Sequence, residues 1–172
     1  MPTSSSFRFF ACAAALAVVA ASPACAQDAA APTSEASAYI EGVTGAGQPD
    51  EAALERLNAA GYAAVIDLRL PHEERGLADE RAAVESQGMS YIPLPIDSRT
   101  DITFDKANEL DRILAQFDGP VLIHCGSGNR VGALMALRAS INGADEETAV
   151  EAGKETGLTR LEDVVRQRLQ AR

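Results

Sequence analysis

The sequence predicts an α/β fold, a mostly parallel sheet flanked by helices, and three observations indicate it. Short apolar runs of strand length alternate along the chain with longer segments of helical periodicity. Polar residues directly follow three of these runs, as DLR at 67–69, PID at 95–97 and HC at 124–125. A glycine-rich segment connects the last run to a helix, as in sites that lie beyond the carboxyl ends of parallel strands.

The first half of the chain contains an edge strand, a helix, a second strand and a charged helix. We expect the edge strand over 39–43 and a helix that enters at Gln48-Pro49-Asp50 and ends at Gly61. The run YAAVIDL at 62–68 has the length and composition of a buried strand. The charged stretch over 73–87 has a helical pattern that Gly88 stops.

The second half continues the alternation and ends in helices. A strand is expected over 89–94, followed by a helix that Thr103 caps and that runs through Phe117. The turn at 118–120 leads into the apolar run before Cys125. Three helical segments follow, near 130–142, 145–156 and 160–170, and Thr159 with Glu162 has the spacing of a capping box for the last.

The most informative segment reads HCGSGNR, residues 124–130, and joins that apolar run to a helix. A loop of this kind can gather backbone N–H groups around one point, where the helix N-terminus adds partial positive charge. Helix N-termini and nearby arginines favour the thiolate form of cysteine, so Cys125 is a candidate nucleophile. The planar guanidinium of Arg130 suits an oxyanion. We therefore expect the anionic substrate to be bound by Gly126, Ser127, Gly128, Asn129 and Arg130.

The N-terminus has the features of a secretory signal peptide over 1–26. Arg8 precedes an apolar stretch over 9–21, and Ala24-Cys25-Ala26 fits a small-residue cleavage site. Lipidation of Cys25 is a weaker alternative, because Ser22 and Pro23 do not fit it. Of the three cysteines, only Cys125 would remain after cleavage, so the exported chain would form no internal disulfide. The sequence thus predicts a periplasmic or secreted protein.

Cleavage would leave 146 residues, enough for one domain, with a disordered leader over 27–38 and a catalytic domain over 39–172. The formal net charge of −10 becomes −11, since Arg8 is the only charged residue in the signal. This balance argues against nucleic acid or an anionic membrane as a partner. The two histidines and the cysteine are too scattered for a zinc site, and we expect neither a metal nor a cofactor.

The order of VIDLR, YIPLPID and GPVLIHCGSGNRVGAL resembles the phosphatase-like domain of beta-lactamase-hydrolase-like proteins. That domain belongs to the wider superfamily of dual-specificity and protein-tyrosine phosphatases, and the likeness spans about 39–157. It implies a dual-specificity-phosphatase-like fold and a phosphate monoester as substrate, in a small molecule or a phosphorylated protein. It also implies that Cys125 attacks phosphorus, Arg130 binds the phosphoryl oxygens, and Asp97 or, as second choice, Asp101 protonates the leaving group.

The loop differs from the phosphatase signature in two ways, and these differences leave other functions open. Four residues separate Cys125 from Arg130 where the signature has five, and Val131 stands where Ser or Thr is usual. A loop of this length resembles that of rhodanese sulfurtransferases, so Cys125 could instead carry sulfane sulfur as a persulfide. A non-catalytic anion-binding module is the third possibility.

The remaining polar residues near the strand ends have structural interpretations. Asp97 could be only a turn or capping residue. Arg69 is expected to pair with Glu73 or Glu74, and His124 to orient the loop through a hydrogen bond and not to act as a base. His72 is expected to be a solvated loop residue.

Overall fold

Four parallel strands form the sheet at the centre of the domain. The structure is a computed structural model, and it describes residues 35–172. The strands lie in the order β1-β4-β2-β3, and every neighbouring pair is parallel. Their bounds are Val43–Ala46 for β1, Ala64–Asp67 for β2, Ser90–Pro93 for β3 and Val121–His124 for β4. The predicted α/β class with a parallel sheet is confirmed.

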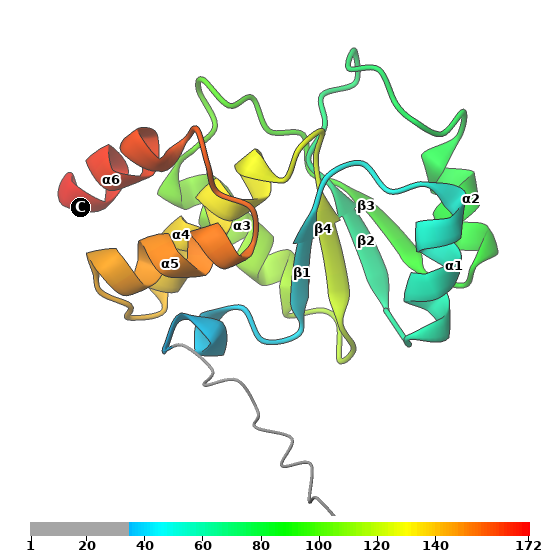
Figure 1. The fold of residues 1–172 in the computed structure, drawn as a ribbon, viewed down its shortest axis with the longest axis horizontal. Coiled ribbons are helices and arrows are strands. Elements are labelled where there is room, and N and C mark those ends of the chain that lie inside the picture. The colour runs from blue at the N-terminus through cyan, green and yellow to red at the C-terminus, as the bar shows by residue number, and fades with distance from the viewer. Residues whose placement is uncertain (1–34) are drawn as a thin grey trace, which may run out of the picture. The chain divides into compact units, whose positions relative to one another are not determined.

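Helices cover both faces of this sheet (Figure 1). Helices α1 and α2 lie on one face, and α3 to α6 lie on the other. The helix bounds are Glu51–Ala59 for α1, Glu80–Ser86 for α2, Phe104–Leu114 for α3, Asn129–Ile141 for α4, Glu146–Glu155 for α5 and Glu162–Gln170 for α6. A 3-10 helix, η1, spans Glu35–Tyr39.

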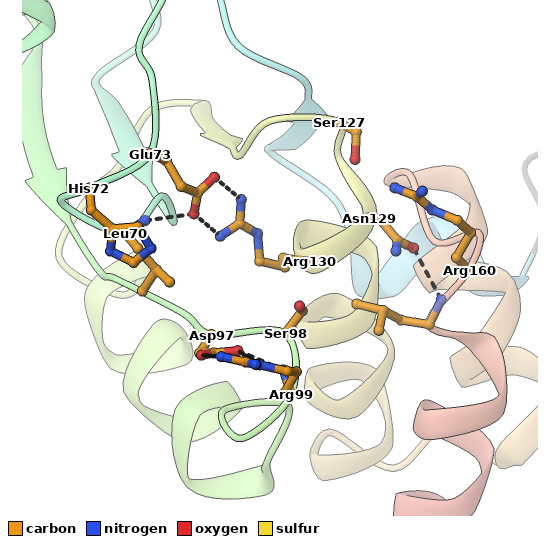
Figure 2. Close-up of a pocket in the computed structure, with 11 residues that line it drawn as sticks. Leu70, His72, Glu73, Asp97, Ser98, Arg99, Ser127, Asn129, Arg130 and Arg160 are labelled. Atoms are coloured by element: carbon orange, nitrogen blue, oxygen red, sulfur yellow. Dashed lines mark hydrogen bonds and ion pairs between the residues drawn. The ribbon is translucent and has the colours of Figure 1, made fainter.

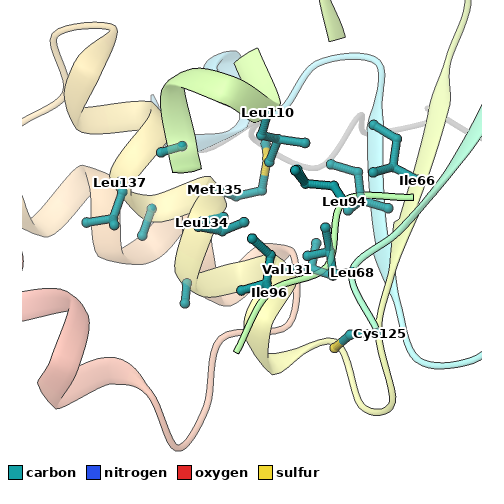
Figure 3. Close-up of a cluster of buried hydrophobic side chains, with 14 of the residues drawn as sticks. Ile66, Leu68, Leu94, Ile96, Leu110, Cys125, Val131, Leu134, Met135 and Leu137 are labelled. Atoms are coloured by element: carbon teal, nitrogen blue, oxygen red, sulfur yellow. The ribbon is translucent and has the colours of Figure 1, made fainter. Parts of the chain in front are cut away.

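The two central strands are buried on both faces because their side chains alternate between two apolar clusters. Ile66 and Ile123 belong to the larger cluster, which also includes residues of α3 and α4 (Figure 3). Val65 and Leu122 belong to the smaller one, with residues of α1 and α2. All four side chains are almost fully buried. This explains why β2 and β4 read as continuous apolar runs and not as alternating ones.

Helix α4 packs closely against α5, and small residues make the approach possible. Gly132 on α4 faces Gly153 on α5. A Cβ at Gly132 would overlap the backbone nitrogen of Leu158 and lie 2.5 Å from the carbonyl oxygen of Gly153. Helix α4 starts at the glycine-rich loop. The contact with α5 therefore sets how the N-terminus of α4 is oriented toward that loop.

The two predicted N-terminal caps have different outcomes. Thr103 accepts a hydrogen bond from the backbone N–H of Lys106, which confirms it as the N-cap of α3. The predicted capping box of Thr159 and Glu162 is wrong, because the N-cap of α6 is Leu161, which makes no side-chain capping bond. Thr159 donates instead to the side-chain oxygen of Asn129 in the loop, over 3.2 Å.

Two other segments differ from expectation. The helix predicted over 73–87 begins only at Glu80, because the residues before it bend to place Glu73 and Arg75 in ion pairs with other elements. The edge strand predicted over 39–43 lies at 43–46. Residues 35–38, part of the predicted disordered leader, are in the 3-10 helix and bury Ala36.

The predicted signal peptide over 1–26 lies outside the described residues, so it stays a prediction, as does the leader up to residue 34. Within 35–172, no helix is long and apolar enough to cross a membrane.

We expect Gly132→Ala to lower the free energy of unfolding by about 1–3 kcal/mol, because the new methyl group overlaps the backbone of α5 and the segment after it. This loss would occur although alanine is the better helix former by about 1 kcal/mol. Urea unfolding followed by circular dichroism measures it. Gly76→Ala is the control, since its Cβ would meet only the flexible side chain of Gln48 at 3.2 Å. Equal stability of the two variants would contradict the close-packing explanation.

Candidate active site

The loop between β4 and α4 is closed tightly around the Cys125 sulfur. Gly128, with φ of +82°, ends the loop and precedes α4 in the left-handed conformation that glycine adopts without strain. Its backbone N–H donates to Sγ of Cys125 over 3.2 Å. The end of β1 and the residue after it hold the other side of the loop, because Cys125 N donates to the carbonyl of Ala46 and Ser127 pairs with Gly47 in a β-bridge.

Cys125 is a free thiol and only 1% exposed. Figure 3 shows it at the edge of the apolar core, near Val131 and Leu68. The residue that connects it to the surface is Arg130, which interacts with the Cys125 sulfur and also lines an adjacent cavity.

Arg130 is held by three segments of the chain. Its Nη1 and Nη2 donate to the two carboxylate oxygens of Glu73, over 2.5 and 2.8 Å. Nη1 also donates to the backbone carbonyls of Ile96, over 3.0 Å, and Leu68, over 3.4 Å. The pKa of Arg130 is raised, mainly by the bond to Glu73, although burial acts in the opposite direction, and the interaction with Cys125 raises it further.

Glu73 is the site residue that sequence reasoning assigned to another role. It does lie 3.7 Å from Arg69, as expected, but its stronger bonds go to Arg130. The bond from Arg130 lowers the pKa of Glu73 to about 2, so the carboxylate stays charged at any pH near neutral. The signal in the sequence was the pair of acids in PHEER, directly after a strand end.

A cavity of about 460 Å³ opens over the loop. Figure 2 shows its lining, in which Glu73 and Arg130 face Asp97 and Arg99 across the opening. The full lining is Leu70, His72, Glu73, Asp97, Ser98, Arg99, Ser127, Asn129, Arg130, Arg160 and Leu161. The strand-end segments thus converge on one site, as expected, with Arg130 bonded to the backbone after β2 and after β3. His72 is exposed, as expected.

The two candidate acids have different places. Asp97 lines the cavity, and its carboxylate accepts bonds from the backbone and the side chain of Arg99. These bonds lower the pKa of Asp97. Asp101 does not line the cavity, and its carboxylate accepts bonds from Asp97 N and the Thr100 hydroxyl. Asp101 therefore supports the turn that presents Asp97.

Among the predicted binding residues, Asn129 turns its side chain away from the sulfur. Its Oδ1 accepts bonds from the backbone N–H of Thr159, over 2.8 Å, and of Leu161, over 3.3 Å. Ser127 and Arg130 line the cavity with it, while Gly126 and Gly128 contribute backbone to the loop. Asn129 thus joins the start of α4 to the segment before α6.

His124 belongs to a buried polar cluster and not to the cavity. Its Nε2 lies 2.9 Å from Glu80 Oε1, although neither ring nitrogen has hydrogen-bond geometry to any described partner. Asp67 lies beside them and accepts bonds from Tyr91, over 2.6 Å, and from Arg75. Burial alone would raise the pKa of Asp67, but the bonds from Tyr91, the Arg69 amide and Arg75 lower it. The expected loop-orienting hydrogen bond of His124 is therefore not present.

Donor atoms of Asp67, Glu80 and His124 lie within 4.8 Å of one another, which is close enough for a metal ion. Arg75 already places one positive charge in this set, however, because it binds Asp67 and lies 3.5 Å from Glu80. We interpret the cluster as a buried ion network beside the end of β4.

Comparison with known proteins gives a consistent result. A family model described as DSP-PTPase phosphatase fused to NAD+ kinase matches residues 12–167. A beta-lactamase hydrolase-like protein of Agrobacterium fabrum is 32% identical over 114 residues, 64% of this chain and 26% of that protein. Its counterpart in Xylella fastidiosa is 35% identical over 109 residues, 62% and 25% of the two chains. The chain therefore spans about a quarter of the length of these relatives.

Solved structures share the fold. A phosphatase candidate from Neisseria meningitidis superposes with a TM-score of 0.67 at 22% identity, over 78% of this chain and 96% of that one. A second, from Shewanella putrefaciens, gives a TM-score of 0.60 at 20% identity, over 77% and 89%.

We expect Glu73→Gln to lower the free energy of unfolding at pH 7 by on the order of 1–2 kcal/mol, because Arg130 loses a charged, two-point partner that is partly open to solvent. The pKa of Glu73 is lowered from its ordinary 4.5 to about 2, so its contribution is complete above about pH 4.5. This contribution is lost as the pH falls toward 2. The difference in unfolding free energy between the native protein and the variant should therefore narrow below pH 4.5.

Urea unfolding at pH 7 and between pH 4.5 and 3.5 measures this difference. Glu74→Gln, one residue along and exposed, is the matched control and should leave stability nearly unchanged at both pH values. A stability difference that stays constant down to pH 3.5 would show that the bond to Arg130 does not lower the pKa of Glu73.

Proposed function

The chain belongs to the family described as DSP-PTPase phosphatase fused to NAD+ kinase, and we propose that it hydrolyses a phosphate monoester with Cys125 as nucleophile. The observation that carries the proposal is the position of Arg130. Its guanidinium interacts with the Cys125 sulfur and lines the cavity in which Asp97 lies. Arg130 therefore links the buried nucleophile to the opening that the proton donor lines, and covalent phosphoryl transfer needs these three roles close together.

In the first step the Cys125 thiolate attacks phosphorus, and the bond between phosphorus and the leaving oxygen breaks. Arg130 and the loop N–H groups hold the non-bridging oxygens, and Asp97 gives its proton to the departing alkoxide or phenoxide. In the second step water attacks the thiophosphate, Asp97 accepts a proton from that water, and phosphate leaves with Cys125 again a thiolate. The loop and Arg130 supply the positive field for both steps.

Asp97 must carry a proton to act as the acid. Arg99 stabilises its charged form and lowers its pKa, so protonated Asp97 becomes scarce as the pH rises. We therefore expect hydrolysis of esters with poor leaving groups to be fastest on the acidic side of neutrality.

Sulfur transfer is the second candidate, and the dimensions of the loop favour it. Among the described residues, one backbone N–H, that of Gly128, donates to Sγ, and four residues separate Cys125 from Arg130. A single sulfane sulfur needs less room and fewer donors than three phosphoryl oxygens. In this case Cys125 would take the outer sulfur of thiosulfate and release sulfite, and cyanide would then remove that sulfur as thiocyanate.

We expect the native protein to hydrolyse a small aryl phosphate and Cys125→Ser to lose this activity, because a serine hydroxyl has no comparable anionic fraction near neutral pH. Mass spectrometry of the acid-quenched native protein should find a phosphoryl group on Cys125. Thiocyanate formation from thiosulfate and cyanide is measured in parallel. Robust thiocyanate formation with no aryl phosphate hydrolysis would overturn the phosphatase proposal in favour of sulfur transfer.

We expect Asp97→Asn to reduce kcat by about 10²-fold or more for an alkyl phosphate and much less for an activated aryl phosphate, since only the poor leaving group needs the proton. The measurement is kcat for a series of esters of rising leaving-group pKa. Asp101→Asn, which removes a carboxylate that does not line the cavity, should not steepen this dependence.

The pH–rate profile of Arg99→Gln also tests the role of Asp97 as the proton donor. Removing the guanidinium raises the pKa of Asp97 toward its ordinary value, so the alkaline limb of the pH–rate profile should move to higher pH. An unmoved limb, together with a flat leaving-group dependence in Asp97→Asn, would remove Asp97 from the mechanism.

A further inference from the structure

The cavity over the loop is positively charged although the chain carries a net charge of −10. Two of its arginines are already neutralised within the lining, because Arg130 binds Glu73 and Arg99 binds Asp97. Arg160 remains as a third cation in the same lining. The charged residues of the lining therefore keep a net positive charge. This charge favours a ligand that carries an additional negative group.

Arg160 has no partner of its own among residues 35–172. Its side chain makes no hydrogen bond or ion pair with any residue in the described part of the chain, and it is exposed. Figure 2 shows it beside Asn129 and Ser127, on the side of the cavity away from His72. The other long cations near α6 differ from it, since Arg166 binds acids on α5 and α6 and Arg168 binds the carbonyl of Ile102.

The backbone at Arg160 is nevertheless fixed to the catalytic loop. The residues on both sides, Thr159 and Leu161, donate their backbone N–H groups to Oδ1 of Asn129, over 2.8 and 3.3 Å. The Thr159 hydroxyl donates to the same oxygen, over 3.2 Å. Asn129 directly precedes Arg130, so Arg160 is held at a set position relative to the phosphoryl-binding arginine.

We propose that Arg160 forms a second anion subsite, and that the substrate is a small phosphate monoester with a second anionic group, a carboxylate or a further phosphate. This inference rests on the proposed function. The cavity of about 460 Å³ has the size of small-molecule sites. The scissile phosphate would lie at Cys125 and Arg130, and the second anion would lie against the guanidinium of Arg160, which offers planar, paired donors.

The test uses matched pairs of aryl phosphates that carry, opposite the phosphate, either a carboxylate or its uncharged amide on a chain of one to three methylene groups. The spacer keeps the leaving groups alike within a pair. We expect the full-length protein to prefer the carboxylate by about threefold to tenfold in kcat/KM at one or more spacer lengths, mainly through KM. Arg160→Gln should bring this ratio close to one.

Arg112→Gln is the matched control, because it removes the same charge from an exposed arginine in the last turn of α3, outside the cavity lining. It should retain the preference. A native ratio near one at every spacer length, or a preference that survives in Arg160→Gln, would overturn the subsite.

Binding of the corresponding non-hydrolysable phosphonates, followed by calorimetry, separates this inference from the proposed function. If no ester is turned over but the carboxylate phosphonate binds more tightly than its amide and loses that advantage in Arg160→Gln, the subsite stands and the phosphatase proposal fails. If neither phosphonate binds, both fail. If the esters are hydrolysed without an Arg160-dependent preference, only the subsite fails.

Discussion

The ion pair between Arg130 and Glu73 joins the parts of the site that come from different strands. The guanidinium reaches the Glu73 carboxylate and the carbonyl of Leu68 after β2, and the carbonyl of Ile96 after β3. It also interacts electrostatically with Cys125, which follows β4. Acceptors from the segments after β2 and β3 thus converge on one planar cation, which leaves few orientations open to it. Such a fixed donor stabilises developing charge without reorganising during the reaction.

The end of β4 places two chemically different residues on opposite faces of the sheet. His124 points into the buried network of Glu80, Asp67 and Arg75, whereas Cys125, one residue later, faces the loop and Arg130. This is the alternation of strand side chains applied at the point where the strand ends. The charged groups beside His124 therefore lie apart from the cavity, whose lining does not include them.

The sequence was sufficient for the fold and for the loop, because both depend on local patterns. Apolar runs of strand length identify β2 and β4, and the glycines between Cys125 and Arg130 identify the tight loop that joins β4 to α4. It was insufficient where a long-range contact outweighs a local preference. Thr159 and Glu162 have capping-box spacing, yet the Asn129 amide, 30 residues away in sequence, binds Thr159. Glu73 begins a stretch with a helical sequence pattern, yet it lies in a loop, where it binds Arg130.

The same long-range contacts explain how a strongly acidic chain can bind an anion. The overall field of the molecule repels negative ligands, so attraction has to come from cations placed within a few ångströms of the ligand, where screening is weakest. A loop with four residues between Cys125 and Arg130 provides fewer amide donors than one with five, which increases the share that arginine side chains must supply. Asn129 links two of these arginines. It precedes Arg130 in the loop, and its side chain binds the backbone on both sides of Arg160. One side-chain amide thereby couples the geometry of two cations that are far apart in sequence.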